Sequence, residues 1–172
     1  SSVAGWIAIF QEDDAELKEQ ALQQLLLSVD YAWHEIAEIL PDLEALAEEE
    51  NHATAAALAS RVLFHLQEPV AALRIAVTCQ QLFLLNDDSP YATALTQTAL
   101  DAYIGLRQDK ETEGLSIEQL QPMVNNFLKV ACDNHKYQEA VGIALEARLP
   151  EQLKSILETA NNDIGLLQYT LR

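Results

Sequence analysis

Apolar residues recur every three or four positions along most of this chain, and that period constrains its fold more than any other feature. Such spacing places the apolar side chains on one face of an α-helix. No strand-like alternation persists long enough to build a sheet. Glycine and proline number only five each among 172 residues, so few positions break a helix. The sequence therefore predicts an all-α fold, and its clearest helical run is Ile117, Leu120, Val124, Phe127 and Ala131.

Short turn-forming segments divide the helical stretches into pairs. Residues 67–69 separate two apolar helical patterns, and residues 133–135 separate two more. A tight turn brings two helices together as an antiparallel hairpin. The helix around Leu73 and Val77 is apolar on more than one side, as expected when hairpins stack. We predict stacked antiparallel helical hairpins, an α-solenoid rod of about nine to eleven helices, forming a single helical-array domain over residues 1–172.

Capping residues mark where several of these helices begin. Ser89 is predicted to cap a helix whose first residue is Pro90, because proline is favoured at the first helical position. Ser116 is followed three residues later by Gln119, which is the pattern of a capping box. Tyr137 follows the second turn directly, and packing and turn chemistry account for it.

The first fifty residues give a less regular pattern. An apolar segment at residues 3–10 precedes a helical pattern at residues 15–29. Asp30 is predicted to cap the next helix, whose apolar stripe includes Trp33. Pro41 then breaks that helix or restarts it as a first-turn proline.

The two hairpins form a weak internal repeat. At an offset of 68 residues, Ala72 aligns with Ala140 and Ala76 aligns with Ala144. Small residues at these positions are expected to face a neighbouring helix. Gly142 lies between the second pair, and a mid-helix glycine costs about 1 kcal/mol relative to alanine. We predict that Gly142 packs closely against another helix, so that Gly142→Leu would overpack the contact.

The charge is strongly negative and unevenly distributed. The net charge of −17 disfavours binding to nucleic acid and to anionic membranes. Residues 1–50 hold 13 Asp or Glu and a single base, Lys18. This end of the chain is a candidate surface for a basic partner, although solubility alone would also explain it. The candidate partner-binding residues are Glu44, Glu48, Glu49 and Glu50.

The cysteines indicate a reducing compartment, and the hydropathy indicates no membrane helix. Cys79 and Cys132 lie far apart in apolar helical contexts, where a free thiol packs as a small hydrophobic group. No apolar run approaches the roughly 18 residues that a membrane helix needs. The N-terminal segment lacks the basic residues of a signal peptide. We therefore expect a cytosolic or nuclear location.

No motif with catalytic, cofactor-binding or metal-binding spacing stands out. HEIAE, residues 34–38, resembles a zinc-protease motif without its second histidine, and one imidazole alone does not hold the metal. DDSPY, residues 87–91, is better explained as a helix cap than as a magnesium motif. The adjacent Asp13 and Asp14 are better explained as solvated charge. We expect no enzymatic activity, no cofactor and no small-molecule substrate.

Nearly the whole chain resembles one protein family. It is similar to the N-terminal rod of the larger non-ATPase scaffold subunits of the 26S proteasome regulatory particle base, which belong to the proteasome/cyclosome-repeat family. The resemblance begins with AGWIAIFQEDDAELKEQALQQL and WHEIAEILPDLEALAEEE. It continues through ALASRVLFHLQEPVAALRIAVTCQQLFLLNDDSPYATAL and DNHKYQEAVGIALEARLPEQLKSILE. The most specific stretch is HKYQEAVGIALEAR.

This resemblance implies a role that the periodicity does not. It implies a non-catalytic scaffold in the cytoplasm and nucleus, which supports assembly of the regulatory particle and ubiquitin-dependent protein degradation. The partners would be other regulatory-particle subunits, and the chain would be the beginning of a much longer scaffold. Residues 164–171 are expected to be loosely held, because Leu166, Leu167 and Leu171 would pack on a following helix.

Two other classes of protein remain open from the residues. A tetratricopeptide-like module would need a concave groove with Asn, Lys or Arg facing a peptide terminus, and the chain holds only ten Lys and Arg in all. A small all-α enzyme would need a cluster of polar residues in a pocket, and no motif supplies one.

Overall fold

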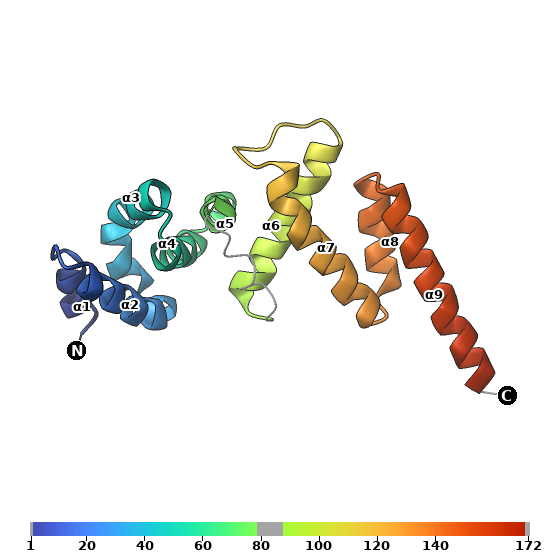
Figure 1. Cartoon of the computed structure of the whole chain (residues 1–172), viewed down its shortest axis with the longest axis horizontal. Helices are drawn as coiled ribbons and strands as arrows, with labels where there is room; N and C mark the ends of the chain where they lie inside the picture. The colour runs from blue at the N-terminus through green and yellow to red at the C-terminus, as the bar shows by residue number, and fades with distance from the viewer. Residues whose placement is uncertain (1, 79–87, 171–172) are drawn as a thin grey trace. The chain divides into compact units, whose positions relative to one another are not determined.

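The structure is a computed structural model that describes residues 2–78 and 88–170, with residues 165–170 described as backbone alone. Within those ranges the chain is helical and contains no strand, which confirms the all-α prediction (Figure 1). The helices are α1 (Val3–Phe10), α2 (Ala15–Ile36), the 3-10 turn η1 (Ala37–Ile39), α3 (Leu40–Glu50), α4 (Ala53–His65), α5 (Pro69–Thr78), α6 (Pro90–Arg107), α7 (Ile117–Asp133), α8 (Tyr137–Glu146) and α9 (Pro150–Thr170).

The helices group into two compact units. The first spans Ser1–Thr98 and the second spans Ala99–Arg172, with the boundary inside α6. Each unit is a set of helices that pack on helices one or two places away in the sequence, as stacked hairpins require. The single helical-array domain expected over residues 1–172 remains a prediction.

In the first unit, α4 is the central helix. It packs against α2, α3 and α5, while α1 packs against α2. Residues 55–60, with the sequence AAALAS, are all buried, so α4 has no solvent-facing side over this stretch. Alanine allows neighbouring helices to approach closely on several sides. A helix with little amphipathic contrast is expected at the centre of a stack.

The helix α2 is longer than the sequence indicated. Its helical conformation continues past Asp30 to a break at Ala32, so a second helical segment does begin near the predicted position, but two residues later than Asp30. The N-cap of α2 is Asp14, whose carboxylate accepts hydrogen bonds from the amides of Glu16 and Leu17 at 3.0 and 3.1 Å. Buried side chains continue on one face through Ile36, so packing keeps the chain helical beyond Asp30. The change of direction comes at Ala32, whose φ and ψ of −116° and 15° are not helical.

The end of α6 shows a left-handed residue and a pair of backbone bonds at Asp109, with φ of 61°, and a longer loop follows it. The two predicted turns and a third turn between helices share this geometry. Each turn contains one residue in the left-handed region: Gln67, His135 and Arg148, with φ of 62°, 59° and 56°. In each copy that residue's amide donates to a carbonyl three positions back, and the next amide donates to a carbonyl five positions back. This pair of bonds is the Schellman motif, which satisfies the last carbonyls of a helix. The next helix then begins within two residues.

In the second unit, the end of α6 is tied to the end of α8. The Arg107 guanidinium donates to the carbonyls of Ala147 and Arg148, both at 3.0 Å, and Gln108 donates to the carbonyl of Glu146 at 3.2 Å. A charged donor at these carbonyls complements the negative end of the α8 dipole. These bonds hold the end of α6 against the end of α8, and α8 packs against α9 (Figure 1).

The prediction of a close helix contact at Gly142 is wrong. A Cβ atom built there meets no heavy atom within 4 Å. The residues that α8 buries are Ala140 and Ala144, and Gly142 lies on a side of the helix that no other described helix covers. The alignment found the small residues of the contact face correctly, but Gly142 does not share that face.

Candidate interaction surfaces

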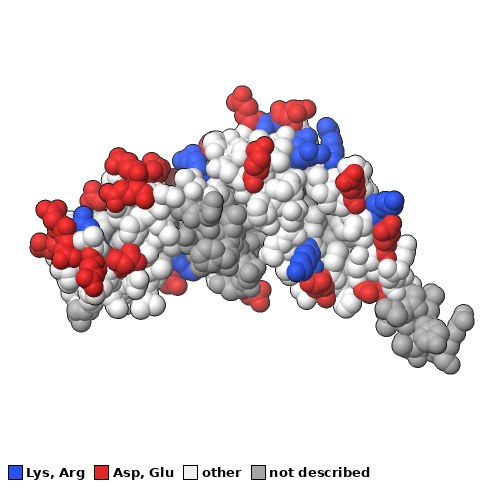
Figure 2. Space-filling view, in the orientation of Figure 1, with Lys and Arg blue, Asp and Glu red and all other residues white. Residues whose placement is uncertain are grey.

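The acidic residues of the first fifty positions lie mostly at the surface of the first unit. Figure 2 shows red side chains gathered over α1 to α3, with little blue among them. The one base of this stretch, Lys18, is half-buried and its ammonium lies 5.8 Å from the centre of the Phe10 ring. One ammonium offsets little of the charge of the 13 carboxylates in residues 1–50, so this surface is attractive to a positively charged group.

The candidate residues Glu48, Glu49 and Glu50 occupy the last turn of α3. All three are exposed, and that turn contains no basic residue. The carboxyl end of a helix carries a partial negative charge, so three carboxylates there work against the stability of α3. Asn51 ends the helix in the left-handed conformation, with φ of 53°. Helix stability does not explain these charges, whereas solubility or a basic partner would.

Glu44 lies one turn earlier and differs from these three. It is half-buried, and burial raises the pKa of its carboxyl, with a further contribution from Glu48. The positive charge of Arg74 on α5 acts in the opposite direction. Glu44 is thus the candidate whose charge is costliest to maintain in the folded chain.

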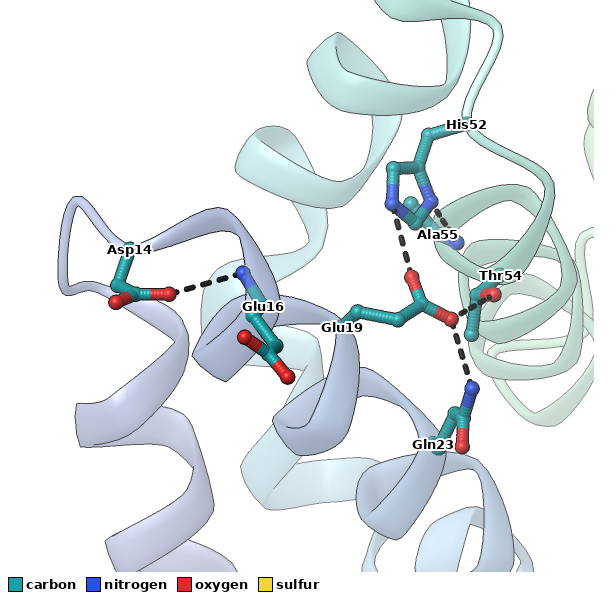
Figure 3. Close-up of polar contacts among 7 residues, drawn as sticks. All are labelled: Asp14, Glu16, Glu19, Gln23, His52, Thr54 and Ala55. Atoms are coloured by element: carbon teal, nitrogen blue, oxygen red, sulfur yellow. Dashed lines mark hydrogen bonds and ion pairs between the residues drawn. The ribbon is translucent and has the colours of Figure 1, made fainter.

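A second polar cluster joins the start of α2 to the start of α4 (Figure 3). The Glu19 carboxylate faces His52 and Thr54 across the two helices. One of its oxygens accepts hydrogen bonds from Thr54 at 2.8 Å and from Gln23 at 2.9 Å. Its other oxygen lies 3.0 Å from His52 Nε2. The carboxylate is therefore already satisfied by groups of this chain and is not free to bind a ligand.

The bonds of His52 determine which of its nitrogens carries the proton. Its Nδ1 caps α4 by accepting a hydrogen bond from the amide of Ala55 at 3.2 Å. An accepting Nδ1 carries no proton, so Nε2 carries it and donates to Glu19. His52 therefore acts as an N-cap and as a link between helices. This pair was not predictable from the sequence, because histidine is not among the usual N-caps.

A buried bond fixes the first turn of α6 within the first unit. Ser60 Oγ donates to the carbonyl of Ala72 at 2.8 Å and lies 2.6 Å from Tyr91 Oη, which therefore donates to it. The Arg61 guanidinium lies 4.4 Å from the centre of the Tyr91 ring. Burial raises the pKa of the Tyr91 hydroxyl, so it stays protonated as a donor. The sequence feature that could have indicated this bond is a single serine, Ser60, at the end of an alanine-rich stretch.

The residues predicted to be structural lie in defined contacts. The Trp33 ring stacks on His65 with centroids 5.8 Å apart and planes 9° from parallel. Ser89 Oγ accepts from the amide of Ala92 at 3.1 Å, and Pro90 is the first residue of α6. The capping box of Ser116 is present, with reciprocal bonds to Gln119 of 3.0 and 3.3 Å.

The second unit contains a polar link between α8 and α9. The Tyr137 hydroxyl donates to the Asp163 carboxylate, and His135 Nδ1 lies 2.9 Å from the same oxygen. His135 comes from the turn that precedes α8, and Tyr137 is the first residue of α8. Ala140 and Ala144 are buried on the same helix. This arrangement agrees with the packing and turn role expected of Tyr137.

A shallow groove also lies in the second unit, between α7 and α9. Leu128 and Ile156 supply buried apolar side chains, and the rim carries Lys129 beside Asp133. Cys132, a half-buried free thiol, lines it, and burial raises its pKa, assisted by nearby carboxylates. A raised pKa leaves little thiolate, so Cys132 is a poor nucleophile. The rim's opposite charges do not define one class of ligand.

The remaining sequence candidates do not gather into a site. Over residues 2–78 and 88–164, no three His, Cys, Asp or Glu side chains are placed to hold a metal ion. His34 is exposed and meets the edge of the Trp33 ring. Cys79, Asp87 and Leu171, and the side chains of Leu166 and Leu167, lie outside the described residues. In the part of the chain that the structure describes, no helix is long and apolar enough to cross a membrane.

Comparison with known proteins decides between the classes that the residues left open. The family model described as the N-terminal domain of 26S proteasome subunit RPN2 matches residues 1–172. This chain belongs to the RPN2 N-terminal domain family. Neither a tetratricopeptide-like module nor a small all-α enzyme is favoured by that match, and the family resemblance seen in the sequence is confirmed.

Relatives within the RPN2 family come from distant organisms. The chain is 33% identical, over 99% of its length, to 26S proteasome non-ATPase regulatory subunit 1 homolog B of Arabidopsis thaliana. It is 30% identical to the RPN2 regulatory subunit of Candida glabrata and to non-ATPase regulatory subunit 1 of Drosophila melanogaster, over 92% and 98% of its length. The chain spans about 18% of the length of these relatives, or slightly less.

Proposed function

We propose that this chain is the N-terminal helical part of a non-catalytic scaffold subunit of the 26S proteasome regulatory particle. The observation that carries the proposal is the RPN2 N-terminal domain match over residues 1–172. The helical hairpins support it, because stacked hairpins offer long surfaces on which several proteins can dock. The scaffold would hold other regulatory-particle subunits together and so support ubiquitin-dependent protein degradation in the cytoplasm and nucleus.

In this proposal, the chain acts through its surfaces and not through an active site. The polar clusters at Glu19 and Ser60 are occupied by bonds within the chain, and they hold helices in place. The acidic last turn of α3 is the proposed partner-binding surface, formed by Glu48, Glu49 and Glu50 with the half-buried Glu44 beside it. A basic surface on a neighbouring subunit would neutralise the charges that α3 tolerates poorly on its own.

Affinity purification of the full-length protein tests this function. A tagged full-length protein, expressed in the cells from which the sequence comes, is expected to recover regulatory-particle ATPases and lid subunits at moderate salt. Mass spectrometry identifies the recovered chains, and an untagged strain gives the background. Recovery of no proteasome subunit above that background would refute the proposed function and leave the fold unaffected.

A further inference from the structure

The helix α2 has two faces with the spacing of a helix–helix seam, and only one of them is covered. The inner face is buried against α1 and α4 and includes Leu22, Leu25 and Val29. The outer face repeats every seven residues at Leu17, Gln24 and Tyr31, and again at Gln20 and Leu27. All five outer side chains are exposed. The five residues are spaced alternately three and four positions apart, as the a and d positions of a heptad are. Leu17, Gln24 and Tyr31 correspond to a positions, and Gln20 and Leu27 correspond to d positions.

The outer face is apolar where exposure is greatest. Leu27 is 78% exposed and Tyr31 is 71% exposed, and they lie one turn apart, so their side chains adjoin. Leu17 extends the line toward the start of the helix at 42% exposure. A single exposed leucine is ordinary on a protein surface. Three large apolar groups in heptad register, along about 21 Å of one helix, match the surface that a second helix packs against.

The charges beside this line limit what can bind to it. Glu16 stands at a flanking position of the heptad. Asp30 stands at another, but its carboxylate already contacts His65 and Arg61 of α4, at 3.2 and 3.8 Å. Glu35 lies on the segment that follows the break in helical conformation at Ala32. All three are exposed, and α2 has only one lysine or arginine, Lys18, which lies over Phe10. In paired helices, flanking charges select a partner of opposite sign. A second copy of this acidic unit would be repelled, whereas a helix with flanking lysines or arginines would be attracted.

We propose that the outer face of α2, formed by Leu17, Gln20, Gln24, Leu27 and Tyr31, docks one α-helix of another protein that carries apolar seam residues flanked by lysine or arginine. Leu27 and Tyr31 are the apolar anchors, and the exposed Glu16 and Glu35, with the acidic surface of the first unit around them, select the basic flanks. The two glutamines weaken the seam relative to a fully apolar one, so the contact is reversible. This inference rests on the proposed function and names a partner's chemistry at a surface distinct from the end of α3.

Site-specific photocrosslinking in the full-length protein tests the proposal. A benzoylphenylalanine is placed at Leu27 or Tyr31, with Leu66, which is 40% exposed in the same unit, as the control position. Both seam positions are expected to crosslink to one helical segment of a partner, at sites three, four or seven residues apart, with lysine or arginine beside them. The control position should not reach that segment.

Paired variants test the two halves of the proposal separately. Leu27→Ser/Tyr31→Ser is expected to reduce recovery of the crosslinked partner by about tenfold or more, whereas Leu66→Ser leaves it unchanged. Glu16→Gln/Glu35→Gln, which leaves the contacts of Asp30 with His65 and Arg61 intact, should weaken recovery and flatten its dependence on salt. Because every substituted side chain is on the surface, unfolding temperatures should change little, and measuring them checks that the variants are folded.

Several results would overturn the proposal. These are no crosslink above the Leu66 level, crosslinks to this chain or a second copy of it, crosslinks to a non-helical or acidic segment, or variants that recover the partner as well as wild type. If wild type still recovers regulatory-particle subunits in those cases, only the α2 seam is refuted. If it recovers none, the proposed function itself has failed.

Discussion

At the scale of single residues, Gly142 is the clearest place to gain stability. A Cβ there meets nothing within 4 Å, so alanine adds helix propensity without crowding. We expect Gly142→Ala to raise the free energy of unfolding by about 0.5–1 kcal/mol in a urea melt of the chain. As a control, Ala140→Gly at a buried position should lower it. A loss of stability in Gly142→Ala would mean that something covers this side of α8.

The left-handed turn residues offer a second test at this scale. Gln67 and Arg148 hold φ near 60° without being glycine, a conformation that costs a residue with a Cβ about 1 kcal/mol. Gln67→Gly and Arg148→Gly are each expected to be neutral to stabilising, by up to about 1 kcal/mol. The matched variants Gln67→Ala and Arg148→Ala keep the Cβ and should gain nothing. Clear destabilisation by glycine would argue against the Schellman geometry.

Glu44 gives a prediction about pH. Burial raises the pKa of its carboxyl above the unfolded value, so folding favours the protonated form. The folded chain is therefore penalised at pH values above the folded pKa, and the penalty disappears as pH falls below the unfolded pKa. Glu44→Gln should raise the unfolding temperature at pH 7 and lose that advantage near pH 4, while exposed Glu12→Gln serves as a control. An equal effect at both pH values would contradict the assignment.

At the scale of an element, the carboxylates at the end of α3 are expected to lower the stability of the helix and to strengthen binding to a partner. Replacing Glu48, Glu49 and Glu50 with lysine is expected to stabilise the chain by about 0.3–1 kcal/mol per residue in a thermal melt, because cations favour helix carboxyl ends. The opposite sign is expected for Glu16→Lys in the first turn of α2. In the full-length protein, the same α3 variants should lower recovery of regulatory-particle subunits. Stabilisation with undiminished recovery would remove α3 from the proposed partner-binding surface.

Most helices could be predicted from local sequence because local chemistry determines where they begin and end. The capping box at Ser116 and the start of α6 at Pro90 were predictable because each depends only on residues next to it in the sequence. The continuation of α2 past Asp30 did not follow from local sequence, because packing of Val29 and Ile36 overrides the capping tendency of aspartate. The third turn was also missed, since the residues around Arg148 lack the polar cluster that marked the other two.

The negative charge of the candidate surface was predictable from the sequence, but the contacts between residues far apart in the sequence were not. The excess of carboxylates in residues 1–50 is visible in the sequence, and most of them are exposed. The Glu19–Thr54 and Ser60–Tyr91 bonds join residues 35 and 31 positions apart, and only the packed helices bring them together. The outer face of α2 has a heptad pattern in the sequence, but exposure alone distinguishes it from the buried face of the same helix.

At the scale of the whole molecule, the central claim is that this chain belongs to a scaffold on which the 26S regulatory particle depends. Depleting the full-length protein from its own cells and quantifying intact 26S particles on native gels tests that claim most directly. Assembled particles are expected to fall in amount as the protein is lost and to return when the wild-type protein is expressed again. An unchanged amount of intact, active 26S particle after complete depletion would contradict it.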